Sequence, residues 1–216
     1  MSKRGRNDKC KIEGMAVEVR QIEFQFKGAR NYIHGTDMFN SIVSSYSSSV
    51  VKNIRFTVHD FVRTPLCQLY LADFKDELNG VGGIRARCQF DAEGVTHWLA
   101  LTQGSGDTSS GGRYTYDEEQ IVSVCRMDGE SIDLLQQSPF TFIENIVAMN
   151  KHMHEQLFPD VDGKWIFTRI DLESRYDSRE KLALRFRHNM NFRLTKSDVV
   201  VDGIKVGDIY FSLVKS

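Results

Sequence analysis

Between residues 181 and 195, apolar and polar side chains alternate almost residue by residue. Leu182, Leu184, Phe186, His188, Met190, Phe192 and Leu194 share one register, and the intervening residues include Arg185, Arg187 and Arg193. A period of two is typical of a β-strand that packs one face and exposes the other. A strand needs neighbours, so this segment predicts an antiparallel sheet with a basic, solvent-exposed face.

A polar segment at the midpoint of the chain suggests a division into two parts. Residues 103–112, QGSGDTSSGG, contain no apolar side chain, which is typical of a flexible connector. We therefore predict a flexible basic tail at 1–13, one unit at 14–102, a Gly/Ser linker at 103–112, and a second unit at 113–216. A nucleic-acid-binding arm is the alternative interpretation of the tail.

The two halves have the same predicted order of elements. Residues 84–90 (IRARCQF) align with residues 184–190 (LRFRHNM), and weaker matches follow in the same order. Each half is predicted as a strand, a helix and about four further strands. In the first half the strands are 16–26, 53–61, 67–74, 83–90 and 95–102, with a turn at 91–94 and a helix that follows Gly35-Thr36-Asp37. In the second half the strands are 120–126, 164–173, 181–195, 198–201 and 205–214, with a turn at Asp202-Gly203 and a helix that Ser138-Pro139 begins and Pro159 ends.

Composition excludes several classes of protein. The formal net charge is −1, whereas nucleic-acid-binding proteins usually carry a marked basic excess. No apolar run approaches the roughly 18 residues of a membrane span, and the start of the chain lacks the apolar core of a secretion signal. The four cysteines stand far apart, which argues against a zinc site, and we expect no metal and no cofactor. The lack of a secretion signal predicts reduced thiols and a cytoplasmic location.

The order of elements resembles the hot-dog fold, an α+β fold in which a curled antiparallel sheet wraps a long helix. Two such units in one chain resemble a double hot dog. The resemblance implies an enzyme acting on acyl thioesters of coenzyme A or acyl carrier protein, of the dehydratase/hydratase or thioesterase type. It also implies an active site between two units and pseudo-dimers that could assemble into homo-oligomers. From the net charge and the lack of a long apolar run we expect no nucleic acid and no membrane as partners.

Two short segments resemble the catalytic positions of hot-dog dehydratases. Phe142-Ile143-Glu144-Asn145-Ile146 resembles the apolar helix that carries the catalytic acid, and Tyr32-Ile33-His34-Gly35 resembles the loop that carries the histidine. A partly desolvated Glu144 would have a raised pKa, which suits a general acid or base near neutral pH. The alternative is that Glu144 lies on the solvent edge of its helix.

The residues after His34 predict an oxyanion site. Backbone N–H groups of Gly35, Thr36 and Asp37 at a helix N-terminus could bind a thioester carbonyl oxygen, and Asp37 is a further catalytic candidate. The alternative is that Thr36 or Asp37 only caps the helix.

Arg185 and Arg187 are candidate substrate-binding residues, because guanidinium groups suit the phosphates of coenzyme A or an acidic carrier protein. Solubility and protection of the sheet from pairing are the alternative. His152 and His154 point to different faces of a helix and are not expected to bind a metal together. If the chain is not an enzyme, we expect a non-catalytic hot-dog module that binds an acyl group or a protein partner.

Overall fold

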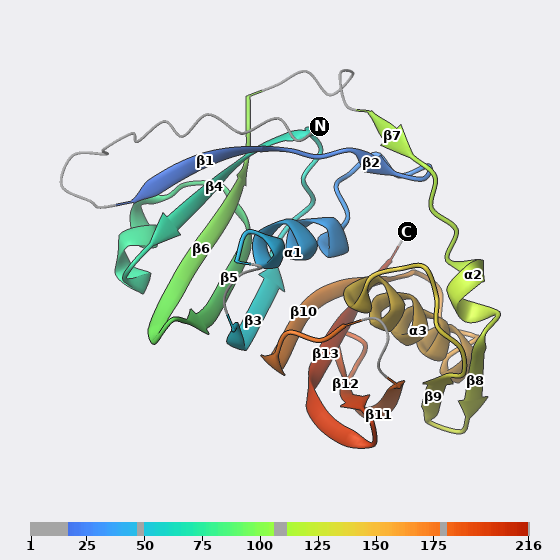
Figure 1. The fold of residues 1–216 in the computed structure, drawn as a ribbon. Coiled ribbons are helices and arrows are strands. Elements are labelled where there is room, and N and C mark those ends of the chain that lie inside the picture. Colours follow the sequence, from blue (N-terminus) through green and yellow to red (C-terminus); the bar gives the residue numbers. More distant parts are fainter. Residues whose placement is uncertain (1–16, 47–49, 106–111, 178–180, 216) are drawn as a thin grey trace. The chain divides into compact units, whose positions relative to one another are not determined.

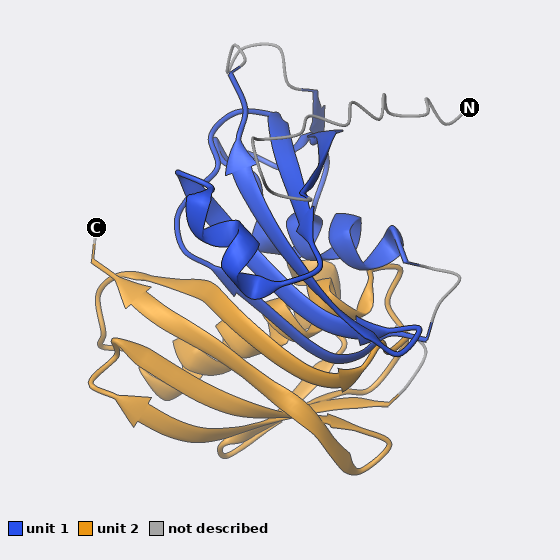
Figure 2. Ribbon diagram, turned by 90° about the vertical axis from the view of Figure 1, so that its left-hand side faces the viewer, with its two compact units in different colours: residues 1–116 blue, residues 117–216 orange. Residues whose placement is uncertain are grey.

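The computed structural model describes residues 17–46, 50–105, 112–177 and 181–215. The predicted tail at 1–13 and most of the predicted linker lie outside the described residues. The chain divides into two compact units, residues 1–116 and 117–216, which Figure 2 colours separately. Residues 113–116 group with the first unit.

Each unit contains a helix and an antiparallel sheet (Figure 1). The first unit contains β1 (Glu18–Glu23), β2 (Phe26–Lys27), α1 (Gly35–Ser44), β3 (Lys52–Val58), β4 (Leu66–Ala72), the 3-10 helix η1 (Lys75–Gly80), β5 (Ile84–Ala92), β6 (Val95–Gln103) and β7 (Arg113–Tyr114). The second contains α2 (Glu119–Val122), β8 (Cys125–Asp128), β9 (Ser131–Leu134), α3 (Phe142–Leu157), β10 (Lys164–Ser174), β11 (Leu182–Met190), β12 (Leu194–Val201) and β13 (Ile204–Val214).

The first unit orders its antiparallel strands β1-β4-β6-β5-β3. The predicted helix is α1, and its apolar spacing buries Met38, Phe39, Ile42 and Val43. The predicted turn between β5 and β6 is confirmed: Glu93 and Gly94 have φ angles of 55° and 78°. Two successive positive φ angles match the twist of a two-residue hairpin.

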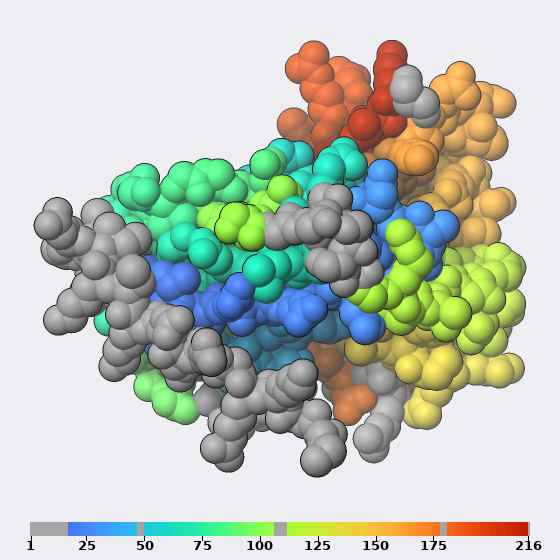
Figure 3. Space-filling model, turned by 90° about the horizontal axis from the view of Figure 1, so that it is seen from above, coloured from blue at the N-terminus to red at the C-terminus, as the bar shows by residue number. Residues whose placement is uncertain are grey.

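A short parallel pair joins two distant parts of the first unit. Phe26 and Lys27 of β2 pair with Arg113 and Tyr114 of β7, and the chain before Arg113 has passed through the Gly/Ser-rich segment. The blue β2 region and the yellow-green β7 region lie side by side in Figure 1 and Figure 3. This pairing brings Tyr114 and Tyr116 to the start of α1.

The second unit orders its antiparallel strands β10-β13-β12-β11-β9-β8. The predicted turn at Asp202 and Gly203 is confirmed by φ angles of 49° and 82°. Every residue of α3 from 142 to 150 is buried, including Glu144 and Asn145. Glu144 is therefore not on a solvent-exposed edge of its helix.

The two sheets differ in the order of the four strands that follow the central helix. In the second unit the four strands lie side by side in the order β11-β12-β13-β10. β11, β12 and β13 follow one another in the chain and are also neighbours in the sheet. In the first unit the order is β4-β6-β5-β3, so β6 lies between β4 and β5. The connection from β4 to β5, which contains η1, therefore crosses β6. The aligned segments 84–90 and 184–190 are both strands, but they occupy different places in their sheets.

Two predicted boundaries in the second unit are wrong. Residues 119–122 form the short helix α2, because the Asp117 carboxylate accepts the Glu119 N–H (3.1 Å) and stabilises a helical turn. The helix predicted to begin at Ser138 begins at Phe142 instead. Thr141 is its N-cap, and Ser138 Oγ accepts the Phe140 N–H (3.2 Å).

The long alternating segment is two strands rather than one. The register shifts between Phe186 and His188, residues 187–190 are all exposed, and Met190 is 64% exposed. Asn191 and Phe192 then turn the chain with φ angles of 51° and 59°. Alternation alone cannot reveal such a turn, because Met190 and Leu194, which pair across the three-residue turn 191–193, are four residues apart and so keep the period of two.

Candidate functional site

The start of α1 holds together four of the residues that the sequence singled out. His34 is the N-cap, with an extended backbone, and its carbonyl accepts the N–H groups of Asp37 (3.0 Å) and Met38 (3.3 Å). Gly35 and Thr36 are the first two helical residues. In any α-helix the first N–H groups have no partner within the helix, so this turn presents donors and a partial positive charge.

A fully buried lysine lies beside this turn. Lys27 Nζ donates to Thr36 Oγ1 (2.9 Å), lies 3.1 Å from Asp37 Oδ1, and lies 4.2 Å from the centre of the Tyr116 ring. The Tyr114 hydroxyl donates to the same Asp37 oxygen (2.8 Å). We call Lys27, Thr36, Asp37, Tyr114 and Tyr116 the Lys27 cluster. A buried ammonium requires such partners, because removing it from water is costly.

His34 is joined to the Lys27 cluster through Thr36. The imidazole Nδ1 lies 2.8 Å from Thr36 Oγ1, which already accepts a hydrogen bond from Lys27. With the ammonium on one lone pair, the Thr36 hydroxyl can donate its proton either to His34 Nδ1 or to Asp37 Oδ1, which lies 3.5 Å away. When the hydroxyl donates to Nδ1, the imidazole proton is on Nε2, and His34 can donate a hydrogen bond through that nitrogen.

Glu144 occupies the first turn of α3, at the third helical position. Its Oε2 accepts the Thr141 N–H (2.9 Å) and the Thr141 hydroxyl (2.6 Å), which completes a capping box. The neighbouring Asn145 is fully buried, and its side chain interacts with Ser138 Oγ and the Phe140 carbonyl. Local contacts therefore fix both the carboxylate and the loop before it.

The most perturbed histidine is one that the sequence did not favour. His154 is fully buried on α3, and its Nδ1 donates to the Asn150 carbonyl (2.6 Å). Its Nε2 lies 2.6 Å from Thr195 Oγ1, and its ring centre lies 4.5 Å from that of Trp165. Burial lowers the pKa of His154 to about 4 and outweighs the Asn150 hydrogen bond, so the ring is neutral at pH 7.

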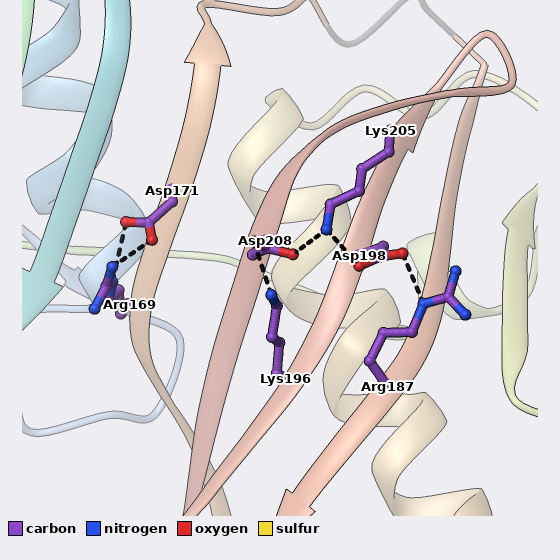
Figure 4. A network of polar contacts seen from close by, with 7 residues as sticks. All are labelled: Arg169, Asp171, Arg187, Lys196, Asp198, Lys205 and Asp208. Atoms are coloured by element: carbon purple, nitrogen blue, oxygen red, sulfur yellow. Dashed lines mark hydrogen bonds and ion pairs between the residues drawn. The ribbon is translucent and has the colours of Figure 1, made fainter.

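The predicted phosphate-binding arginines lie on β11, and one belongs to an ion-pair network. Arg187 Nε donates to Asp198 (2.7 Å), which also contacts Lys205 (2.9 Å), and Figure 4 shows that this network extends across β11, β12 and β13. Burial would raise the pKa of Asp198, but hydrogen bonds from Lys205 and Arg187 outweigh it and hold the pKa below its usual value. Arg185 is exposed. The Arg187 guanidinium therefore helps to neutralise Asp198.

The structure brings His34, Gly35, Thr36 and Asp37 together in the first unit and places Glu144 in the second. The pairing of His34 with Glu144 stays a prediction. Lys27 and Tyr114 were missed, because a lysine at the end of a strand-like segment gives no sign of burial.

Two further searches concern the described residues only. Among them, no three His, Cys, Asp or Glu side chains form a group that could hold a metal ion. Likewise, none of their helices is both long and apolar enough to cross a lipid bilayer.

Comparison with known proteins identifies the fold. No protein-family model and no curated protein sequence matches the chain. An inactive mutant of the CurK dehydratase matches with a TM-score of 0.51 and 8% identity, covering 97% of this chain and 95% of that one. A pyran synthase domain from module nine of the sorangicin pathway matches with a TM-score of 0.50 and 10% identity, covering 99% and 97%. The chain has a hot-dog fold.

Other solved hot-dog structures match less well. A dehydratase domain from the CurF module of the curacin polyketide synthase has a TM-score of 0.49, with 8% identity and coverage of 97% and 98%. Structures described as thioesterases have TM-scores of 0.46 to 0.48. A hot-dog fold hosts more than one activity, so function has to be argued from the side chains of this chain.

Proposed function

We propose that this chain is two tandem hot-dog units that act in the cytoplasm as an enzyme on acyl thioesters, by dehydration/hydration or by hydrolysis. The observation that carries the proposal is the start of α1, where His34 is hydrogen-bonded through Thr36 to a fully buried ammonium. A structural N-cap does not require a buried lysine. A histidine whose proton must be held on one nitrogen gains from such an arrangement.

In this proposal the start of α1 binds the thioester carbonyl. His34 Nε2–H and the first-turn N–H groups of Gly35 and Thr36 donate to the carbonyl oxygen, where negative charge develops as the C2 proton leaves. Asp37 acts as a positioning residue that neutralises Lys27 (3.1 Å) and accepts from Tyr114 (2.8 Å). The Lys27 cluster thereby fixes the donor state of His34.

Glu144 is the proposed acid and base. Its carboxylate takes the C2 proton of a 3-hydroxyacyl thioester and returns it to the departing C3 hydroxyl, which leaves as water while the C2–C3 double bond forms. In a hydrolase the same carboxylate would take a proton from water, and the attacking oxygen would displace the thiolate.

One observation favours a second candidate, a non-catalytic module that binds an acyl group or a partner. Thr141 occupies Glu144 Oε2 with two hydrogen bonds, as it would if the carboxylate served only to cap α3. The two candidates differ in whether Glu144 is needed for turnover or only for the helix.

A mass-spectrometric assay with saturated, 2-enoyl and 3-hydroxyacyl thioesters tests the proposal. A mass change of one water identifies a dehydratase or hydratase, and release of free thiol identifies a thioesterase. We expect Glu144→Gln to lower turnover at least about 100-fold, because general acid–base catalysis contributes that much or more. A glutamine can still close a capping box, so the variant should fold.

Two exposed residues provide matched controls, Glu173→Gln on β10 and His188→Ala on β11. Both should keep wild-type turnover, while His34→Ala loses it. Absence of turnover on every thioester, by protein with wild-type circular dichroism, would refute the enzyme and favour the binding module.

A further inference from the structure

A small cleft in the first unit is lined by two arginines that no acidic side chain of the described residues neutralises. Phe26, Asn31, Arg63 and Arg113 line it, and its volume is about 300 Å³. We propose that this cleft, the Arg63–Arg113 cleft, binds the phosphate group of the carrier to which the acyl chain is attached. The inference rests on the proposed function, because it assigns the carrier end of the same substrate.

The electrostatics of the cleft favour an anion. Among the described residues, no carboxylate contacts Arg63 or Arg113, whereas Arg85, Arg169 and Arg187 each contact an aspartate. The Asn31 side chain adds an amide donor, and no acidic residue lines the cleft. Two guanidinium groups with planar forks match phosphate geometry better than lysines would.

Arg113 is held in place before any ligand arrives. Its Nη1 donates to the carbonyls of Gly28 (2.7 Å) and Arg30 (2.7 Å), and its guanidinium lies 5.4 Å from the centre of the Phe26 ring. These contacts already restrict the side-chain rotations of Arg113, most of which a mobile arginine would lose only when it binds a ligand. The entropic cost of binding an anion is correspondingly reduced.

Aromatic contacts connect the cleft to the start of α1. The Arg63 guanidinium lies 5.7 Å from the Phe61 ring centre, Phe61 lies 4.6 Å from Tyr32, and Tyr32 lies 6.5 Å from His34. Coenzyme A and acyl carrier protein both join their phosphate to the thioester through a flexible pantetheine arm. A phosphate in the cleft and a thioester at His34 would therefore lie at the two ends of one substrate.

The cleft is too small for a whole coenzyme. Pockets that enclose drug-sized ligands span roughly 300 to 1,000 Å³, so this volume holds a phosphate and the first atoms of the arm. The phosphate at the pantetheine end is present in both carriers. The cleft would recognise that shared group.

Calorimetric binding of the full chain to three ligands tests the inference, using pantetheine, phosphopantetheine and coenzyme A. We expect phosphopantetheine to bind at least about 10-fold more tightly than pantetheine, and Arg63→Ala to abolish that difference. Arg63 is exposed, so its loss should not disturb folding; Arg113→Lys provides a second variant that keeps the charge but not the fork. Arg126→Ala, at an exposed arginine on β8 of the second unit, is the matched control.

Each result decides the matter. Equal binding of pantetheine and phosphopantetheine, binding of none of the three, or an equal loss in Arg126→Ala would overturn the proposed role of the cleft. If coenzyme A binds more tightly than phosphopantetheine, the result supports a phosphate site in the cleft and indicates coenzyme A as the carrier. If the two bind equally, the result supports the phosphate site and indicates acyl carrier protein as the carrier.

Turnover of acyl-pantetheine thioesters, which lack the phosphate, separates the two proposals. If the wild type and Arg63→Ala turn over acyl-pantetheine thioesters equally but phosphate does not improve binding, the proposed enzyme activity is supported and the proposed phosphate site is refuted. If phosphate improves binding but no thioester is turned over, the proposed phosphate site is supported and the proposed enzyme activity is refuted.

Discussion

Both central helices begin beside a threonine and an acidic residue, but the two helix starts are stabilised in different ways. At α1, Thr36 is fully buried and lies between the Lys27 ammonium and the His34 imidazole. At α3, Thr141 is exposed and exchanges hydrogen bonds with Glu144 within a single turn. The first arrangement contains a buried charge, and the second contains a local cap.

The two starts also differ in how far along the chain their partners lie. Thr141 and Glu144 are three residues apart, whereas the Lys27 cluster gathers residues from β2, α1 and the segment that contains Tyr114 and Tyr116. A cap of adjacent residues needs no tertiary structure. A cluster with a buried charge forms only when the unit has folded, and such clusters are frequent at functional sites.

The largest effect should come from removing the charge at α1. We expect Lys27→Met to lower the free energy of unfolding of the first unit by about 3 to 5 kcal/mol, because Asp37 would keep a buried charge without its ammonium partner. The chain has two tryptophans, Trp98 and Trp165, one in each unit. Urea unfolding followed by Trp98 fluorescence in a Trp165→Phe background would report on the first unit alone.

Two variants check the cause of that loss. Adding Asp37→Asn to Lys27→Met should recover part of the stability, since the unpaired carboxylate is then gone. Lys52→Met, at an exposed position of β3, should change the free energy of unfolding little. A cost below about 1 kcal/mol for Lys27→Met would show that the two helix starts are alike in energy.

A smaller effect is expected from acid in the second unit. The pKa of His154 is about 4 in the folded chain and about 6.5 in an unfolded one. Between these values the unfolded chain binds a proton that the folded chain does not, so stability is full above pH 6.5 and falls as the pH drops towards 4. The free energy of unfolding should decrease by up to about 3 kcal/mol over this range.

Trp165, whose ring centre lies 4.5 Å from that of His154, can report this titration. Urea unfolding of a Trp98→Phe variant at pH 7 and pH 4.5 would give the slope. In His154→Gln the slope should flatten. An unchanged slope would assign the acid sensitivity to other groups.

The smallest effect should come from the cap of α3. We expect Thr141→Ala to lower the free energy of unfolding of the second unit by about 1 kcal/mol, the usual cost of losing an N-cap hydroxyl. Thermal unfolding of the Trp98→Phe chain would measure it, with Ser123→Ala, an exposed residue of the same unit, as the control. A loss as large as that of Lys27→Met would mean that Thr141 does more than cap the helix.

The sequence predicted the elements that depend on local chemistry. The apolar spacing of α1 and the turns at Glu93-Gly94 and Asp202-Gly203 were correct, because each depends on a few adjacent residues. The failures depend on distant contacts. No local pattern distinguishes a hairpin at Asn191 and Phe192 from a continuous strand, and none distinguishes the two strand orders in the sheets.

In the candidate site, too, the residues set by local sequence could be predicted and those set by distant contacts could not. His34 to Asp37 could be placed at a helix start from their own residue types. The burial of Lys27 could not be predicted, because its ring partner Tyr116 lies much later in the chain. Arg63 and Arg113 were missed for the same reason, since the cleft that they line is formed by three separate segments.

The pairing of β2 with β7 has a consequence for how the chain is made. Residues up to 103 supply every strand of the first unit's main sheet, yet Tyr114 and Tyr116, which complete the surroundings of Lys27, come after the Gly/Ser-rich segment. A nascent chain that has emerged only to the end of β6 would hold a lysine with half of its partners missing. The first unit can therefore complete its fold only after residues 113–116 have left the ribosome.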